Sequence, residues 1–169
     1  MKAIISAHNK KILRDKPEAM ANIDAYGCSC RNKIECPLDG HCKIDNIIYK
    51  AVVTTQPDDG GAAEQHAYIG STSLEFKKRF YGHTRSFICE EETGQTALSR
   101  FVRKLKKSGK EYTIKWSVVK QSKQASKNIK FCNLCNLERK EIAFAIKKNL
   151  LNRRNELVTR CPHNRKLFF

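Results

Sequence analysis

YIGSTSLEFKKRFYGH, the stretch from Tyr68 to His83, is the most informative part of the sequence. It predicts a short strand carrying Tyr68 and Gly70, followed by a helix that places Arg79 and His83 four residues apart on one face. A phenol, a guanidinium and an imidazole brought together are suited to chemistry on a phosphate group. A plain hairpin followed by a basic surface helix would give the same local pattern, so the rest of the chain has to decide.

The flanking residues predict an α+β fold, in which helices flank a small, three-stranded, mostly antiparallel sheet. Turn-forming residues at 56–65 join the first two strands into a hairpin with a long loop. Thr72 or Ser73 is expected to cap the helix after the second strand. From hydrophobic periodicity, the expected strands are 47–55, 66–71 and 111–120, and the expected helices are 74–87, 98–107, 134–150 and 152–158.

The charge of the chain is strongly unbalanced, with 33 Lys and Arg against 17 Asp and Glu and a formal net charge of +16. Such an excess favours a polyanionic partner. Nucleic acid is preferred to a membrane, because the sequence has no long apolar run. A basic protein without a polyanionic ligand is the alternative. Two basic stretches, Arg103–Lys110 and Lys147–Arg154, are candidate phosphate-binding faces or, equally, solvated helix faces.

Four of the eight cysteines lie within fifteen residues. With no export signal at the N-terminus we expect reduced thiols, and clustered reduced thiols indicate zinc rather than a disulfide framework. A flexible reduced loop is the alternative, and His41 could replace one ligand. The expected organisation is a basic, flexible tail at 1–25, a zinc-binding segment at 26–45 and a folded domain at 46–169. The predicted zinc ligands are Cys28, Cys30, Cys36 and Cys42.

A second zinc site would require two segments that are far apart in the sequence. Cys132 and Cys135 open the helix predicted at 134–150, and Cys161 and His163 follow the last predicted helix. Together they would form a Cys3His site that clamps the two helices. Each half is weak by itself, because a CxxC at the start of a helix can also be redox-active or simply buried.

The helix predicted at 134–150 carries Glu138 and Glu141 inside its apolar arc. A carboxylate among apolar neighbours is costly unless it is paired or binds a metal. An oxygen ligand for Mg²⁺ or Mn²⁺ would explain either residue, and so would a structural salt bridge. Periodicity does not choose between the two glutamates.

Asn46-Ile-Ile-Tyr49, Tyr68-Ile-Gly70, Arg79 and His83 in this order resemble the motifs of the GIY-YIG endonuclease family. Glu138 and Asn152 match the family's metal-binding glutamate and its later asparagine. The resemblance covers residues 46–160 and is closest to the endonuclease part of Penelope-like retroelements, which similarly join cysteine-rich segments to this core. Two departures are Ile47, where the family usually has glycine, and the long loop between Tyr49 and Tyr68.

The resemblance implies hydrolysis of a DNA phosphodiester with one divalent metal, Mg²⁺ or Mn²⁺, held by Glu138. Arg79 would stabilise charge on the phosphate, while Tyr49 or Tyr68 would position or deprotonate the attacking water with help from His83. Gly70 would let the backbone pass close to the site, and Asn152 would orient groups near the metal. Each residue also has an ordinary explanation: half-buried strand tyrosines, a Glu75–Arg79 ion pair and a helix cap at Asn152.

Three functions therefore stay open at this stage. The leading hypothesis is an intracellular, nuclear DNA endonuclease that acts in the integration of a mobile element, with RNA or a reverse transcriptase as a further partner. The main alternative is a zinc-stabilised nucleic-acid-binding module without catalysis, such as a decayed retroelement remnant. A structural factor whose charge serves RNA packaging is the third. The sequence does not indicate the oligomeric state or the target of cleavage.

Overall fold

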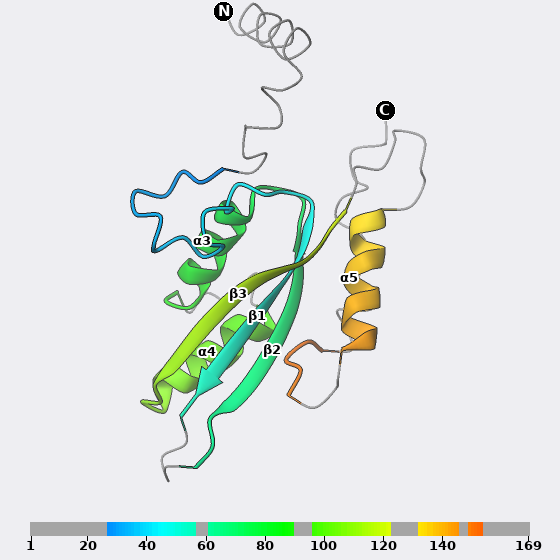
Figure 1. Cartoon of the computed structure of the whole chain (residues 1–169). Helices are drawn as coiled ribbons and strands as arrows, with labels where there is room; N and C mark the ends of the chain where they lie inside the picture. Colours follow the sequence, from blue (N-terminus) through cyan, green and yellow to red (C-terminus); the bar gives the residue numbers. More distant parts are fainter. Residues whose placement is uncertain (1–26, 57–60, 90–95, 123–131, 146–148, 154–169) are drawn as a thin grey trace, which may run out of the picture. The chain divides into compact units, whose positions relative to one another are not determined.

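The structure is a computed structural model that describes residues 27–56, 61–89, 96–122, 132–145 and 149–153. It confirms the α+β class, because the described residues form one three-stranded antiparallel sheet and three helices. The chain divides into two compact units with the boundary between Ile44 and Asp45. The second unit contains, in order, β1 (Ile47–Thr55), β2 (Glu64–Thr72), α3 (Phe76–Ser86), α4 (Ala97–Lys107), β3 (Tyr112–Gln121) and α5 (Asn133–Phe144) (Figure 1).

The sheet has the order β2-β1-β3, so β1 is the central strand and pairs antiparallel with both neighbours. Because side chains alternate along a strand, Tyr49 and Ala51 point to one face and Ile48 and Lys50 to the other. We call these the aromatic face and the α5 face. The pairing of Tyr49 with Gly70 and of Ala51 with Tyr68 continues both faces across β2.

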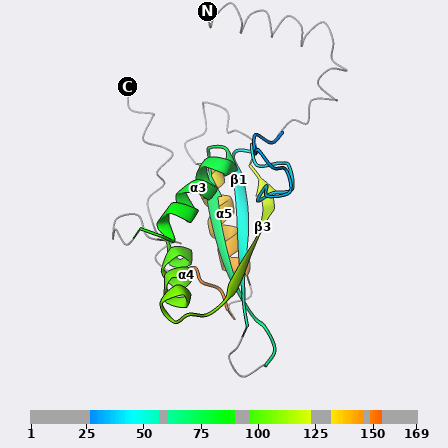
Figure 2. The ribbon, with the colours of Figure 1, turned by 90° about the vertical axis from the view of Figure 1, so that its left-hand side faces the viewer.

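The two faces are covered by different helices: Figure 1 shows α3 and α5 on opposite sides of the strands, and Figure 2 shows α3 and α4 together on one side. On the aromatic face, Phe76 of α3 packs against Tyr49 with ring centroids 5.3 Å apart, and Phe101 of α4 lies 4.6 Å from the His66 ring. On the α5 face, a buried apolar cluster joins sheet and helix. It consists of Ile48, Ile69, Leu134 and Ile142.

A β-bulge interrupts the pairing of β1 with β3 beside Tyr49. Ile48 pairs with Lys120 and Tyr49 with Val118, so Val119 has no partner on β1. A bulge bends a strand and changes the direction of nearby side chains, and it is over-represented next to functional sites. Without the bulge, Lys120 would lie on the same face as Val118. With it, Lys120 lies opposite Ile48 on the α5 face.

Helix α3 begins later than predicted. Its N-cap is Glu75, which makes no side-chain capping bond, so the expected cap at Thr72 or Ser73 is wrong. The Thr72 hydroxyl instead accepts a hydrogen bond from the backbone N–H of Leu74 and donates one to its carbonyl oxygen. This local turn competes with the helix, as short hydroxyl side chains often do.

Helix α5 ends at Phe144, earlier than the predicted helix at 134–150. The reason is that the following residues pair with the outer edge of β2. Ala67 donates its backbone N–H to the carbonyl of Asn149 and accepts the N–H of Leu151, which forms a parallel bridge at Leu150. Pairing of this kind satisfies the polar groups of an edge strand. The helix predicted at 152–158 lies almost wholly outside the described residues.

The Asn152 side chain extends this edge pairing by one step. Its Oδ1 accepts the backbone N–H of Ile69 at 2.8 Å, and its Nδ2 donates to the Ile69 carbonyl at 2.7 Å. One carboxamide thereby replaces the two main-chain bonds that a further strand residue would make. Asn152 therefore holds the segment after α5 against β2.

Other parts of the sequence-based organisation lie outside the described residues, notably the tail at 1–25. Within the described residues, every helix is too short or too polar to cross a lipid bilayer.

Replacing Asn152 by alanine should lower the free energy of unfolding by about 1–3 kcal/mol, because both polar groups of Ile69 lose their partner. Urea denaturation measures the effect. Asn136→Ala, on the exposed side of α5, is the control and should change stability by less than about 0.5 kcal/mol. Equal stability of the two variants would show that the carboxamide does not hold the edge.

Candidate functional site

The site is centred on the hydroxyl of Tyr49, a side chain with 0% exposure in the middle strand. Its oxygen lies 2.7 Å from Nε2 of His83, and Nε of Arg79 donates a hydrogen bond to it at 3.0 Å. Both partners come from α3, where their spacing of four residues puts them on the face that covers the sheet. The structure thus brings together three of the residues singled out from the sequence.

The hydrogen bonds of this group fix one proton position. Arg79 can only donate, so the phenolic oxygen of Tyr49 accepts from it, whereas the bond between this oxygen and Nε2 of His83 runs in the direction that the imidazole tautomer sets. Burial is the main cause that lowers the pKa of His83 to about 3, and the positive charge of Arg79 is the second. The imidazole is therefore neutral at neutral pH.

Tyr68 lies beside this group on the neighbouring strand, with its ring centroid 6.5 Å from Tyr49 and 6.0 Å from His83. Arg79 interacts with both phenols. Burial alone lowers the pKa of Arg79, but the charge and hydrogen bonding of Tyr49 and Tyr68 outweigh burial and leave it raised. The guanidinium therefore lies between two hydroxyl groups that can carry negative charge next to it.

Gly70 is required by close approach rather than by an unusual backbone angle. A Cβ atom added to it would lie 2.5 Å from the Tyr49 hydroxyl oxygen and 3.0 Å from a ring carbon of Tyr68. Both distances are at or below the limit of real contacts. The glycine of the YIG sequence therefore leaves the space that the Tyr49 hydroxyl occupies.

Trp116 of β3 is a site residue that the sequence did not identify. Its ring centroid lies 5.3 Å from His83 and 5.9 Å from Tyr49, so it closes the side of the group away from β2. Trp116 lies within the strand predicted at 111–120, but the sequence contained no sign of its contact with His83. As a large aromatic wall it keeps water from the buried hydrogen bonds.

Glu138 belongs to the α5 face. Leu134, Glu138 and Ile142 lie on one stripe of the helix, and the two apolar residues pack on the sheet. The Ser71 hydroxyl donates a hydrogen bond to Oε2 of Glu138 at 2.8 Å. Helical periodicity did not distinguish Glu138 from Glu141. The hydrogen bond to Ser71 shows that Glu138 contacts the sheet. Ser71 itself was not singled out from the sequence.

Burial raises the pKa of Glu138, and the hydrogen bond from Ser71 and the positive charge of Arg79 each lower it in part. The positive charge of Arg79 thus acts on Glu138, although the two side chains contact opposite faces of the sheet. Mg²⁺ is usually held by one or two carboxylates together with substrate phosphates and water. A single carboxylate under the influence of a cation that can bind phosphate fits this pattern.

The Asn152 side chain binds the backbone of Ile69. Ile69 lies on β2, one residue before Gly70 and two before Ser71. By holding the edge of β2, it supports the strand that carries Tyr68, Gly70 and Ser71. Of the seven residues expected in the catalytic site, five therefore meet at the aromatic face, and Glu138 and Asn152 attach to β2 separately.

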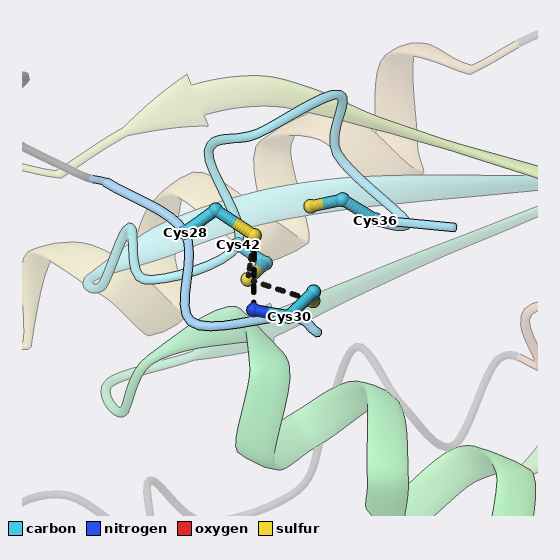
Figure 3. Close-up of side chains that lie close together, drawn as sticks. All are labelled: Cys28, Cys30, Cys36 and Cys42. Carbon is cyan, nitrogen blue, oxygen red and sulfur yellow. Dashed lines mark hydrogen bonds between the residues drawn. The ribbon is translucent and has the colours of Figure 1, made fainter. Parts of the chain in front are cut away.

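The cysteine cluster lies in the first unit. The four Sγ atoms of Cys28, Cys30, Cys36 and Cys42 all lie within 4.8 Å of one another, and Figure 3 shows the side chains converging. The sulfur of Cys42 is 3.5 Å from that of Cys28 and 3.6 Å from that of Cys30. This arrangement can hold a metal ion such as zinc, as the sequence predicted, and it uses Cys42 rather than His41.

The thiols of this cluster differ in acidity. The hydrogen bond from the backbone N–H of Cys30 lowers the pKa of Cys28 to about 7, whereas burial raises the pKa of Cys42 to about 12. A bound cation would reverse the effect on Cys42, because a coordinating thiol is deprotonated.

Only half of the second predicted zinc site can be located. Cys132 is the N-cap of α5, where its sulfur accepts the backbone N–H of Cys135, and Cys135 is buried. Cys161 and His163 lie outside the described residues, so this site stays a prediction.

Gly70→Ala should lower the free energy of unfolding by about 1–3 kcal/mol, because the new methyl group overlaps the Tyr49 hydroxyl. Gly82→Ala is the matched control. A Cβ there meets nothing within 4 Å, and α3 should gain up to about 1 kcal/mol from the better helix former. Thermal and urea unfolding distinguish the two, and a stabilising effect at Gly70 would show that the close approach is wrong.

Comparisons with protein-family models, curated proteins and solved structures give no match to this chain.

Proposed function

We propose that the chain is a metal-dependent DNA endonuclease of the GIY-YIG type, which hydrolyses phosphodiester bonds. The observation that carries the proposal is the buried hydroxyl of Tyr49, held between Arg79 and a neutral His83. An ordinary basic surface helix has no reason to bury an arginine and a histidine against a strand tyrosine. An ion pair with Glu75 is not needed to explain Arg79, because Arg79 donates a hydrogen bond to the Tyr49 phenol instead.

Arg79 is the group proposed to stabilise charge on the phosphate. Its side chain is only partly buried, while the Tyr49 hydroxyl that it contacts is completely buried. The bond to Tyr49 limits the rotation of the guanidinium and leaves other N–H groups to donate to phosphate oxygens. Pre-oriented donors of this kind need no reorganisation during the reaction.

The two phenols are assigned different roles on the basis of burial. Tyr49 is sealed inside the fold and keeps Arg79 in place, with His83 as its second hydrogen-bond partner. Tyr68 keeps 5% of its surface exposed and also interacts with Arg79, so it is the phenol proposed to accept a proton from the attacking water. The charge of Arg79 stabilises the phenolate that this role requires.

Glu138 is proposed to bind Mg²⁺ or Mn²⁺, with Ser71 orienting its carboxylate. When bound, the metal supplies Lewis-acid stabilisation of the phosphate oxygens. The four cysteines of the first unit are proposed to bind a structural Zn²⁺. With Zn–S bonds of about 2.3 Å, the sulfurs of a tetrahedral site lie roughly 3.8 Å apart, close to the separations of Cys42 from Cys28 and Cys30.

The net charge of +16 supports DNA as the polyanionic substrate. A role in the integration of a mobile element, in the nucleus and together with RNA or a reverse transcriptase, belongs to the same proposal. The charge and the cysteine cluster equally suit a nucleic-acid-binding module without catalysis. That module would retain DNA binding and show no cleavage.

Plasmid nicking in Mg²⁺ or Mn²⁺ tests the endonuclease. Arg79→Ala should lower the rate by about 10²–10³-fold, because a charge-stabilising donor is lost. Glu138→Ala should abolish metal-dependent nicking, whereas Glu141→Ala on the next turn of α5 should retain it. If wild-type protein binds DNA but does not nick it in the presence of any divalent metal, only the non-catalytic binding module remains. If Glu138→Ala nicks DNA at the wild-type rate, Glu138 is not the metal ligand.

Zinc content tests the cysteine cluster. Purified protein should contain about one zinc ion per chain if only the first site forms, and two if Cys132, Cys135, Cys161 and His163 form the second. Cys36→Ser should reduce the content by about one ion. Cys89→Ser, an exposed cysteine outside the cluster, is the control and should change nothing. Folded wild-type protein without zinc would exclude both sites.

A further inference from the structure

The α5 face of the sheet is only partly covered. Helix α5 packs over β2 and the start of β1, through Ile48 and Ile69. On the other side of this face, the outward residues of β3 are exposed and polar or charged. The register places Lys120 opposite Ile48, Ser117 opposite Lys50, Lys115 opposite Val52 and Thr113 opposite Thr54. We call Lys50, Lys115 and Lys120, together with Ser117 between them and Thr113 at the end beyond Lys115, the basic strip.

The three lysines of the basic strip point to the same side of the sheet and follow one another along it, with Lys50 between the levels of Lys120 and Lys115. Lys50 is diagonal to Lys115 across the β1–β3 pair, a separation of roughly 7–8 Å between such positions. Among the described residues, none of the three has a carboxylate within ion-pair distance. The recorded ion pair, between His66 and Glu64, lies on the aromatic face. Clustered ammonium groups without carboxylates repel one another unless an anion lies between them.

The basic strip runs from one candidate site to a hollow. At one end it approaches Ile48, whose partner on β2 is Ser71, the residue bonded to Glu138. At the other end lies a hollow of about 530 Å³, whose lining includes Thr54, Thr113 and Lys110. The distance from Thr113 to Lys120 along β3 is about 23 Å, the length of roughly seven base pairs of duplex DNA.

We propose that the basic strip binds the sugar–phosphate backbone of duplex DNA and directs the bound strand to Glu138. The inference rests on the proposed function, because it takes Glu138 as the end of the path. Lysines contact phosphates as point charges, and the hydroxyls of Ser117 and Thr113 donate to phosphate oxygens. Contacts to phosphates carry no sequence information, so the binding that the strip supplies is independent of sequence.

This assignment differs from the two basic stretches seen in the sequence. Lys104 and Lys107 of the stretch Arg103–Lys110 are exposed on α4, which covers the aromatic face, whereas Glu138 lies on the α5 face. The strip lysines are scattered over β1 and β3 in the sequence and meet only through strand pairing. Most of the stretch Lys147–Arg154 lies outside the described residues.

Binding of a short fluorescent DNA duplex, measured by anisotropy without Mg²⁺ or Mn²⁺ over a range of salt concentrations, tests the proposal. The triple variant Lys50→Gln, Lys115→Gln, Lys120→Gln should bind roughly a hundredfold more weakly at 0.1 M salt. The slope of log K against log salt should fall in magnitude by about two to three, since each lost phosphate contact removes about 0.9. The corresponding triple lysine-to-arginine variant retains the charges and should bind like wild type, which separates lost contacts from misfolding.

The matched control removes three exposed charges from the helices of the aromatic face, with Arg85→Gln, Lys104→Gln and Lys107→Gln. It should change the affinity by less than about threefold. An equal loss in this control, or wild-type binding by the glutamine variant of the strip, would overturn the proposal. The proposal would also be overturned if the glutamine variant of the strip lost RNA binding but retained binding to duplex DNA. If the strip behaves as expected and wild type never nicks, the DNA interface stands and the endonuclease fails.

Discussion

The hydroxyl of Tyr49 is the group on which the arrangement of the second unit depends. A phenol buried in the central strand must find hydrogen-bond partners inside the protein, since an unpaired buried hydroxyl is costly. Arg79 and His83 satisfy it, and this requirement sets the rotation of α3 on the sheet. The same hydroxyl explains Gly70, because any larger residue there would occupy its space. One buried oxygen thus connects β1, β2 and α3.

The chemistry of the candidate site is divided between the two faces of the sheet. Tyr49, Tyr68, Arg79 and His83 lie on the aromatic face, whereas Glu138 reaches Ser71 on the α5 face. This division requires the central strand to be buried on both of its faces. Ile48 on one face and Tyr49 on the other are both completely buried. The charge of Arg79 still acts on Glu138, so the division does not separate the groups electrostatically. A phosphate that meets both groups would be bound near the end of β2.

The cysteine-rich unit follows a different principle. A segment of this length cannot bury enough apolar surface to fold on a hydrophobic core, and its four thiols converge instead. Burial raises the pKa of Cys42, and a bound zinc ion would stabilise the thiolate that burial disfavours. In this unit, metal binding and folding are expected to be the same event.

The amino-acid sequence by itself determined the class of the fold, the approximate bounds of its strands and helices, and the five residues that meet around Tyr49. Periodicity predicted all three strands and three helices, with β1 at its observed bounds, and the order of Tyr, Gly, Arg and His indicated one site. Local pattern could not predict what depends on distant partners. Helix α5 stops early because Asn149 and Leu151 pair with β2, and Asn152 bonds to that edge. The contact of Glu138 with Ser71, the contact of Trp116 with His83 and the assembly of the basic strip were decided by tertiary structure. Each joins residues that only strand register and helix packing bring together.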